Sequence, residues 1–385
     1  MRIVIAPDKF KGCLAAGGVA EAIARGVRAA CSGAIEVAVD LVPMADGGEG
    51  TVEALVNATS GSLREARVTG PLGEERRATY GMLGDGKTAV IEMAAASGLV
   101  LVPPAQRDPM IATTRGTGEL LLHAIAAGAT NVILGIGGSA TNDGGAGLAQ
   151  ALGYRLLDRQ GNDLTPGGGP LADLDRIDAS KVSPLLKSVS VRVACDVDNP
   201  LYGERGASAV FGPQKGATPE MVATLDHNLA HFARLIERDL GLSVGALPGA
   251  GAAGGLGAGL VAFAAGTLGP GIDLVIDAVG LEKRLQGASM CMTGEGALDA
   301  SSAGGKTAVG VARVAKRLGV PTIALVGSIG TGASAVLSQG LCAYFSICSG
   351  PMTLDESMGC AASLLEGCAE QVTRAFLAGR GPHAT

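Results

Sequence analysis

The abundance and placement of glycine restrict the fold of this 385-residue chain more than any other feature of its sequence. The chain contains 61 glycines, and they show no Gly-X-Y period, which excludes a collagen-like fold. They lie beside apolar runs, at the ends of apparent strands, and so indicate tight loops rather than a flexible linker. Because only 3% of the residues are aromatic, Ala, Val, Leu and Ile must fill the core, as in parallel strands covered by Ala-rich helices.

Strands and helices alternate at both ends of the chain. Near the N-terminus, a strand over 2–6 precedes a helix over about 16–30, and a strand over 36–42 precedes a helix over 51–59. This order predicts an α/β fold with a parallel sheet. The C-terminal part shows the same pattern, with strands over 290–293 and 322–326 and helices over 306–318 and about 354–378.

The middle of the chain begins differently. Short runs over 67–69, 77–82 and 88–93 are separated by Gly-containing turns and predict antiparallel hairpins. Because a single core rarely grows beyond ~250–300 residues, we expect two domains. The first would be discontinuous, over 1–66 and 286–385, and the second would be inserted between its halves, over 67–285. Within the inserted part the pattern predicts helices over 117–128 and 219–241 and strands over 131–135 and 190–194.

Charge and cysteine usage exclude several classes of protein. The formal net charge is −6 and no basic block occurs, which argues against nucleic acid as a partner. The eight cysteines show no CxxC spacing and are typical of buried thiols in a reducing compartment. The N-terminal MRIVIAPDKFKG is neither a signal peptide nor a membrane span. We therefore expect a cytoplasmic protein without a membrane partner; a homodimer is compatible with the sequence.

Two loops after the first strands carry charged side chains. Asp8, Lys9 and Lys11 lie just past the first strand, at the edge where open α/β sheets bind ligands, and could hold an acidic substrate; the alternative is a solvated turn. After the second strand, Asp46 and Glu49 lie three residues apart on a glycine loop. They could hold Mg²⁺, bind substrate hydroxyls or cap the next helix.

The longest glycine loop is GIGGSATNDGGAG over 135–147. Its first six residues fit G-x-G-x-x-A, and Asp158 follows 18 residues after Ala140, as in a dinucleotide-binding fingerprint. That fingerprint needs a helix that starts within the glycines, whereas here the helix is expected only near Ala146. The loop is better suited to cradle a phosphate, and a bare structural turn is the other alternative. Its candidate residues are Gly137, Gly138, Ser139, Asn142 and Asp143.

Three further loops carry candidate residues. Asp196 follows the strand over 190–194 and could be a general base or a metal ligand. Lys215 lies in FGPQKGA and could contact phosphate or be a surface lysine. TGEGALD, with Glu295 and Asp299, follows a strand, and Lys306 opens a helix in GGKT. The P-loop template does not fit this last segment, because its first glycine falls on an alanine.

Taken together and in this order, these loops resemble the bacterial type I glycerate kinases. The matching stretches cover nearly the whole chain: APDKFKG (6–12), PMADGGEGT (43–51), EMAAASGL (92–99), TTRGTGEL (113–120), GIGGSATNDGGAG (135–147), ACDVDNPLYG (194–203), VFGPQKGA (210–217), GAGAAGGLGAGL (249–260) and TGEGALD (293–299). This chain departs from the family in having Cys13 where Ser is frequent, Ala297 where Arg is usual, and Ser301 near a usual Gln. The missing Arg removes a charge contact expected from that loop.

The resemblance implies phosphorylation of D-glycerate by ATP with Mg²⁺, giving 2-phosphoglycerate. It also implies a discontinuous flavodoxin/Rossmann-like parallel-sheet domain and an inserted α/β domain with a mixed sheet, with the active site in the cleft between them. Two other functions stay open from the residues alone: an NAD-dependent oxidoreductase of a small hydroxy acid, and a non-catalytic metabolite-binding protein.

The candidate residues can be given roles in phosphoryl transfer, which needs positioning and charge neutralisation. Lys9 or Lys11 would pair with the glycerate carboxylate, and Asp8 would orient a hydroxyl. Asp196 would accept the alcohol proton. The remaining candidates would bind substrate or metal (Asp46, Glu49, Asn142, Asp143) or nucleotide phosphates (Gly137, Gly138, Ser139, Lys215, Glu295, Asp299, Lys306).

Overall fold

The computed structural model describes residues 1–32 and 35–379. The chain divides into two compact units. The first consists of Met1–Asp46, Glu53–Thr59 and the chain from Ile272 onward. The second consists of Gly47–Val52 and Ser60–Gly271. The division therefore falls near residues 60 and 271, whereas the sequence suggested 66 and 286. The first boundary lies before residue 66 because the whole strand β3 (Ser62–Thr69) pairs in the sheet of the second unit.

The first unit is built on a five-stranded sheet in the order β13-β12-β11-β1-β2, in which every neighbouring pair is parallel. This confirms the expected Rossmann-like sheet, with the N-terminal strand next to a strand from near the C-terminus. The predicted strand over 290–293 is too short. The segment TGEGAL (293–298), which was expected to be a loop, continues β11 in register with β12. The strands are β1 (Arg2–Ile5), β2 (Ala38–Leu41), β11 (Met290–Leu298), β12 (Thr322–Ile329) and β13 (Ala343–Ser346).

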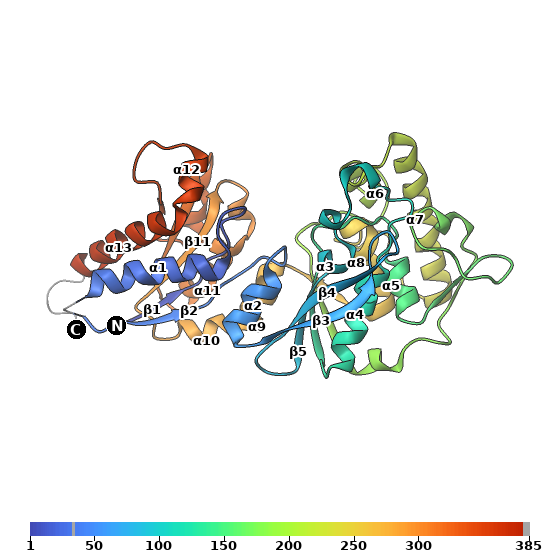
Figure 1. Ribbon diagram of the computed structural model, residues 1–385, viewed down its shortest axis with the longest axis horizontal. Helices are drawn as coiled ribbons and strands as arrows, with labels where there is room; N and C mark the ends of the chain where they lie inside the picture. The colour runs from blue at the N-terminus through green and yellow to red at the C-terminus, as the bar shows by residue number, and fades with distance from the viewer. Residues whose placement is uncertain (33–34, 380–385) are drawn as a thin grey trace. The chain divides into compact units, whose positions relative to one another are not determined.

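Helices cover both faces of this sheet. On one face, α1 and α13 lie side by side (Figure 1) and pack with Ile3, Ile5 and Leu325. Because side chains alternate along a strand, Ala324 and Val326 point to the other face, where they pack with α11. The C-terminal helix predicted over 354–378 is two helices, Leu354–Gly359 and Ala361–Gly379, with a break at Cys360. The helices are α1 (Ala16–Cys31), α2 (Thr51–Thr59), α9 (Gly271–Val279), α10 (Leu281–Leu285), η6 (Ser302–Gly304), α11 (Thr307–Arg317), η7 (Ala333–Gln339), α12 (Leu354–Gly359) and α13 (Ala361–Gly379).

The second unit contains a six-stranded mixed sheet in the order β10-β9-β6-β5-β4-β3. As predicted, β3, β4 and β5 pair antiparallel, while β5, β6, β9 and β10 are parallel. Two short strands, β7 and β8, form a separate antiparallel pair. The strands are β3 (Ser62–Thr69), β4 (Glu75–Met82), β5 (Thr88–Glu92), β6 (Asn131–Gly135), β7 (Arg155–Leu157), β8 (Arg176–Asp178), β9 (Ser190–Ala194) and β10 (Thr267–Gly269).

The core of the second unit is filled mainly by aliphatic residues and by a stacked pair of rings, Phe232 and Phe263, whose centroids lie 5.8 Å apart. Phe232 comes from the long helix α7, which ends at Gly241 in a left-handed conformation, a frequent helix stop. The helices are α3 (Ala94–Ser97), η1 (Leu99–Leu101), η2 (Pro104–Gln106), α4 (Arg115–Ala126), α5 (Ala146–Ala151), η3 (Pro170–Asp173), η4 (Pro184–Ser188), α6 (Ala207–Phe211), η5 (Pro213–Lys215), α7 (Pro219–Leu240) and α8 (Ala252–Ala264).

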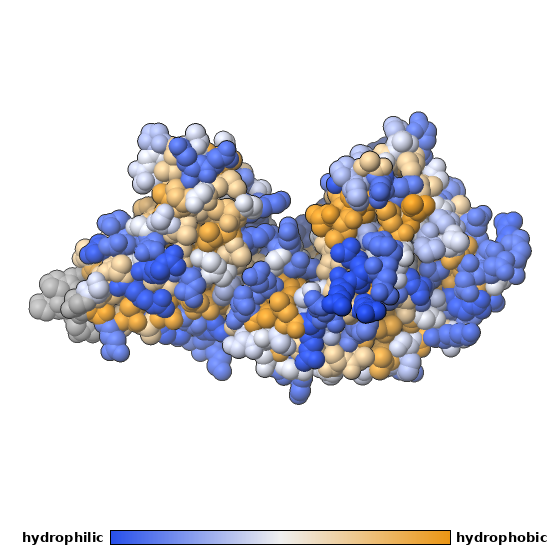
Figure 2. All heavy atoms as spheres, in the orientation of Figure 1, coloured by the Kyte–Doolittle hydropathy of each residue, from blue (hydrophilic) through white to orange (hydrophobic). Residues whose placement is uncertain are grey.

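Hydrophilic residues cover much of the face drawn in Figure 2, with smaller hydrophobic areas on each unit. Exposed apolar side chains include Val100 and Ile111 in the second unit and Leu354 in the first. Within residues 1–32 and 35–379, every helix is too short or too polar to span a lipid bilayer.

Candidate functional site

In the first unit, predicted site residues gather at the carboxyl edge of the parallel sheet. Asp8 follows β1 and is only 9% exposed. Its Oδ2 accepts a hydrogen bond from the Thr307 hydroxyl at 2.6 Å, and its Oδ1 accepts one from the backbone N–H of Lys9 at 2.7 Å. Burial raises the pKa of Asp8, the bond from Thr307 opposes this rise, and the charge of Asp46 adds to it. Each oxygen of Asp8 therefore accepts one hydrogen bond, and the carboxylate of Asp46 lies close by.

Glu295 lies on β11, the strand next to β1, and is 8% exposed. The Ser302 hydroxyl hydrogen-bonds its carboxylate, but its Oε1 has no hydrogen-bond partner among the described residues. Burial raises the pKa of Glu295 to about 7, Lys306 opposes the rise, and the charge of Asp8 adds to it. A buried carboxylate oxygen without a partner is costly and indicates a place where a ligand would contact the protein.

Lys306 lies at the start of α11 beside this carboxylate pair. Its Nζ donates a hydrogen bond to the Ser301 hydroxyl at 2.8 Å, and that hydroxyl in turn donates to Asp299 Oδ1. Asp299 also accepts from the backbone N–H of Ser301 at 2.8 Å. Ser301 lies near the position where the family usually has Gln. Its hydroxyl links Asp299 and Lys306, the two residues predicted to contact phosphate. Lys9 is half-buried, and Lys11 is exposed.

In the second unit, Asp143 lies in the long glycine loop and is completely buried. Its carboxylate accepts four hydrogen bonds, from the backbone N–H and hydroxyl of Thr114 at 2.9 Å each and from the N–H groups of Gly145 and Gly147 at 3.1 Å. Burial raises the pKa of Asp143, and these hydrogen bonds oppose the rise. Asp143 therefore joins the starts of α4 and α5, and the amides expected to cradle an anion at the start of α5 bond to this carboxylate instead.

Two neighbouring residues of the same loop have buried polar atoms without a hydrogen-bond partner among the described residues. The Asn142 amide donates to the Ser208 hydroxyl at 2.9 Å. Asn142 Oδ1 and Thr141 Oγ1 are buried and have no hydrogen-bond partner among the described residues. At the other end of the loop, Gly137 and Gly138 are exposed and Ser139 is buried. The predicted helix start at residue 146 is confirmed by α5.

Lys215 is 1% exposed, which excludes the surface-lysine alternative. Its Nζ donates a hydrogen bond to the carbonyl oxygen of Thr141 at 2.7 Å. Burial lowers the pKa of Lys215 to about 7, and the charge of Asp143 opposes this. Lys215 thus supports the glycine loop from inside the second unit.

Asp196 is an exposed residue just after β9. Its Oδ1 accepts a hydrogen bond at 2.9 Å from the backbone N–H of Gly271, the first residue of α9. Glu49 is also exposed, whereas Asp46 is half-buried. The described residues contain no cluster of three or more His, Cys, Asp and Glu side chains arranged to hold a metal ion.

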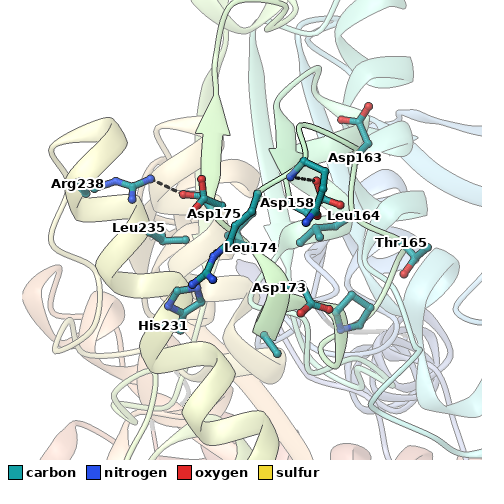
Figure 3. A pocket seen from close by; sticks show the side chains of 14 residues that line it. Asp158, Asp163, Leu164, Thr165, Asp173, Leu174, Asp175, His231, Leu235 and Arg238 are labelled. Carbon is teal, nitrogen blue, oxygen red and sulfur yellow. Dashed lines mark hydrogen bonds between the residues drawn. The ribbon is translucent and has the colours of Figure 1, made fainter.

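A polar pocket of about 770 Å³ lies elsewhere in the second unit (Figure 3). Asp158 and Asp163 line it from one side, and His231 and Arg238 of α7 from another. The Asp158 carboxylate accepts bonds from the backbone N–H groups of Gln160 and Asn162 at 2.9 and 2.8 Å. Asp158 therefore closes a surface turn. Because β7 is not in the sheet of β6, the dinucleotide-binding interpretation is wrong.

Sequence reasoning missed several residues that organise these sites. Thr307 and Ser302 hold the carboxylates of Asp8 and Glu295, and Thr114 holds Asp143. The stretches GGKT and TTRGTGEL contained two of these hydroxyls. Nothing in their spacing indicated which carboxylate each would meet, because the partners of the Thr307–Asp8 bond are 299 residues apart.

Comparison with known proteins gives a consistent result over the whole chain. Residues 3–377 match the model of the glycerate kinase family. The chain is 53% identical over 357 residues to the glycerate 2-kinase of Escherichia coli, covering 93% of each chain. It is 52% identical over 372 residues to the glycerate kinase of Bacillus subtilis, covering 97% of each chain.

A solved structure assigned as glycerate kinase 2 of Salmonella typhimurium LT2 shares the fold, with a TM-score of 0.90, 50% identity and coverage of 100% of both chains. The chain belongs to the glycerate kinase family.

Proposed function

We propose that this protein is an ATP-dependent glycerate 2-kinase, which transfers the γ-phosphoryl group of ATP to D-glycerate and gives 2-phosphoglycerate. Family membership supports the reaction, and the name of the E. coli relative supports the 2-position. The structural observation that carries the proposal is the group formed by Asp8, Glu295 and Lys306 at the carboxyl edge of a parallel sheet. This edge is where such sheets bind ligands, and the group combines acceptors for hydroxyls with a cation for phosphate.

The substrate would be held by charge and by hydrogen bonds. Lys9 or Lys11 would pair with the glycerate carboxylate, and Asp8 would orient a hydroxyl. Lys306 would neutralise a phosphate oxygen, because phosphoryl transfer depends mainly on positioning and charge stabilisation. In the second unit, Gly137 and Gly138 would offer backbone amides, and Lys215 would act through the loop that it supports.

Mg²⁺ would accompany ATP. Asp46 and Glu49, the proposed ligands, offer the carboxylate oxygens that Mg²⁺ prefers, and Asp46 adds to the negative charge felt by Asp8. Since no cluster of three or more candidate ligands occurs in the described parts of the chain, the ion would take its other ligands from phosphates and water, as is usual for Mg²⁺.

All eight cysteines lie within the described residues and are free, which supports a reducing compartment such as the cytoplasm.

A coupled assay of ADP release with D-glycerate, with and without Mg²⁺, tests this function. We expect turnover of roughly 1–100 s⁻¹, as in other kinases, and a strict need for both substrates. Enolase coupling would identify the product, because enolase consumes only the 2-phosphate. Thermal stabilisation by glycerate without any ADP release would contradict the kinase and favour a non-catalytic binding protein.

A further inference from the structure

Glu295 differs from Asp8 and Asp299 in having a buried carboxylate oxygen that accepts no hydrogen bond from the described residues. It lies on β11 between β1 and β12, is 8% exposed, and its Oε1 has no hydrogen-bond partner among the described residues. In Asp8, its neighbour, each oxygen accepts a hydrogen bond from within the protein, one from Thr307 and one from Lys9. A fold does not leave such an oxygen unsatisfied without cost, so a donor from outside the protein is expected there.

The other acids of the site are less suited to take a proton. Asp196 is exposed and its Oδ1 accepts the N–H of Gly271 at the start of α9. Asp299 Oδ1 accepts both the N–H and the hydroxyl of Ser301. The bonds from Ser301 hold the pKa of Asp299 below its usual value, which makes Asp299 a weaker base.

We propose that Glu295 is the general base of the reaction and that its Oε1 accepts the hydrogen bond, and then the proton, of the glycerate hydroxyl. This inference rests on the glycerate kinase activity proposed above. In the step, the hydroxyl oxygen forms a bond to the γ-phosphorus while its proton passes to the Glu295 carboxylate. The bond from the γ-phosphorus to the bridging oxygen breaks, and its electron pair stays on ADP.

The charges around Glu295 fit this role. Burial raises the pKa of Glu295 to about 7, Lys306 opposes the rise, and Asp8 and Asp299 add to it. A base whose pKa lies near the working pH combines a useful ionised fraction with useful basicity. Lys306, which faces the same carboxylate, would neutralise the phosphoryl oxygens as the proton leaves.

Glu295→Gln in the full-length protein tests the proposal, because Gln keeps the shape but cannot accept the proton. Steady-state kcat and KM for glycerate would be measured from about pH 6 to about pH 9 for the wild type, E295Q and D196N. Glu282→Gln is the matched control, since Glu282 is a surface glutamate of the same unit paired with Arg317 at 3.6 Å. Thermal unfolding of each variant would confirm that it folds.

We expect wild-type kcat/KM to fall about tenfold per pH unit below about pH 7, where Glu295 is protonated. E295Q should lose about 10²–10⁴-fold in kcat, keep KM within a few fold and lose this acid limb, whereas E282Q should match the wild type. A folded E295Q that retains kcat within about threefold, or regains it at high Mg²⁺, would overturn the assignment. A wild-type enzyme without glycerate-dependent ADP release would instead refute the proposed function.

Discussion

At the residue scale, burial changes the meaning of charged side chains that look alike in the sequence. Lys306 and Lys215 both lie in glycine-containing turns, yet Lys306 is exposed and Lys215 is 1% exposed. Lys215 donates to the Thr141 carbonyl and lies near Asp143, whose charge opposes the fall in its pKa. A buried lysine that donates to a backbone carbonyl positions the loop, whereas an exposed ammonium at a helix start can meet phosphate directly.

Lys215→Met should make stability less dependent on pH. The folded pKa of about 7 lies below the unfolded value of ~10.4, so the unfolded wild type binds the proton more tightly. Wild-type stability should therefore fall by roughly 1.4 kcal/mol per pH unit between about pH 10 and pH 7, and K215M should escape this loss. Urea unfolding at about pH 7 and pH 9 measures it. An equal difference between the two proteins at both pH values would contradict the buried, neutral lysine.

At the element scale, two glycine-rich segments pack closely against each other. The Gly144 N–H donates to the Gly254 carbonyl at 3.0 Å, and Gly254 has a left-handed backbone with φ of +70°. A Cβ at this position would lie 1.9 Å from the Thr141 carbonyl oxygen. The start of α8 therefore needs glycine in order to lie directly against the loop that holds Asn142 and Asp143.

Gly254→Ala should destabilise the protein by about 2–5 kcal/mol, because a left-handed conformation costs about 1–2 kcal/mol and overpacking adds about 1–3 kcal/mol. Gly86→Ala is the matched control: Gly86 has φ of +66° with no atom within 4 Å of the added Cβ, so it should lose only the conformational cost of about 1–2 kcal/mol. Chemical denaturation compares them. Similar losses for both would show that the close contact does not determine the effect.

At the scale of the whole molecule, each unit has its own apolar core. Phe232 belongs to the cluster of the second unit, and Ile5 to a cluster of the first. Within the described residues, these two clusters share no member. Separate cores make it possible for one unit to open locally while the other stays protected.

Phe232→Ala should therefore act locally. It should cost about 3–5 kcal/mol and speed amide hydrogen exchange over residues 60–271, while leaving exchange in the strands of the first unit near the wild-type rate. Ile5→Ala should show the reverse pattern. Hydrogen exchange followed by mass spectrometry measures both, and faster exchange throughout the chain in either variant would indicate one cooperative unit.

Local pattern was enough to predict most of the longer helices and strands and to single out the glycine loops, but not the short strands β8, β10 and β13. The alternation of apolar and polar residues predicted the parallel strands at both ends and the hairpins between them, because it follows from the periodicity of each element. The order of glycine loops indicated the glycerate kinase family. The length of β11 was underestimated, because pairing with β12, not local composition, extends it through Glu295.

How each polar side chain is buried and hydrogen-bonded was decided by the tertiary structure. Burial and hydrogen bonding depend on segments brought together from far apart, as in the Thr307–Asp8 bond across 299 residues and the Lys215–Thr141 bond across 74. Residue type alone suggested that Asp143 binds substrate and that Asp196 is the base. Packing surrounds Asp143 with four internal donors and leaves an oxygen of Glu295 without a partner, because desolvation and hydrogen bonding exist only once the chain has folded.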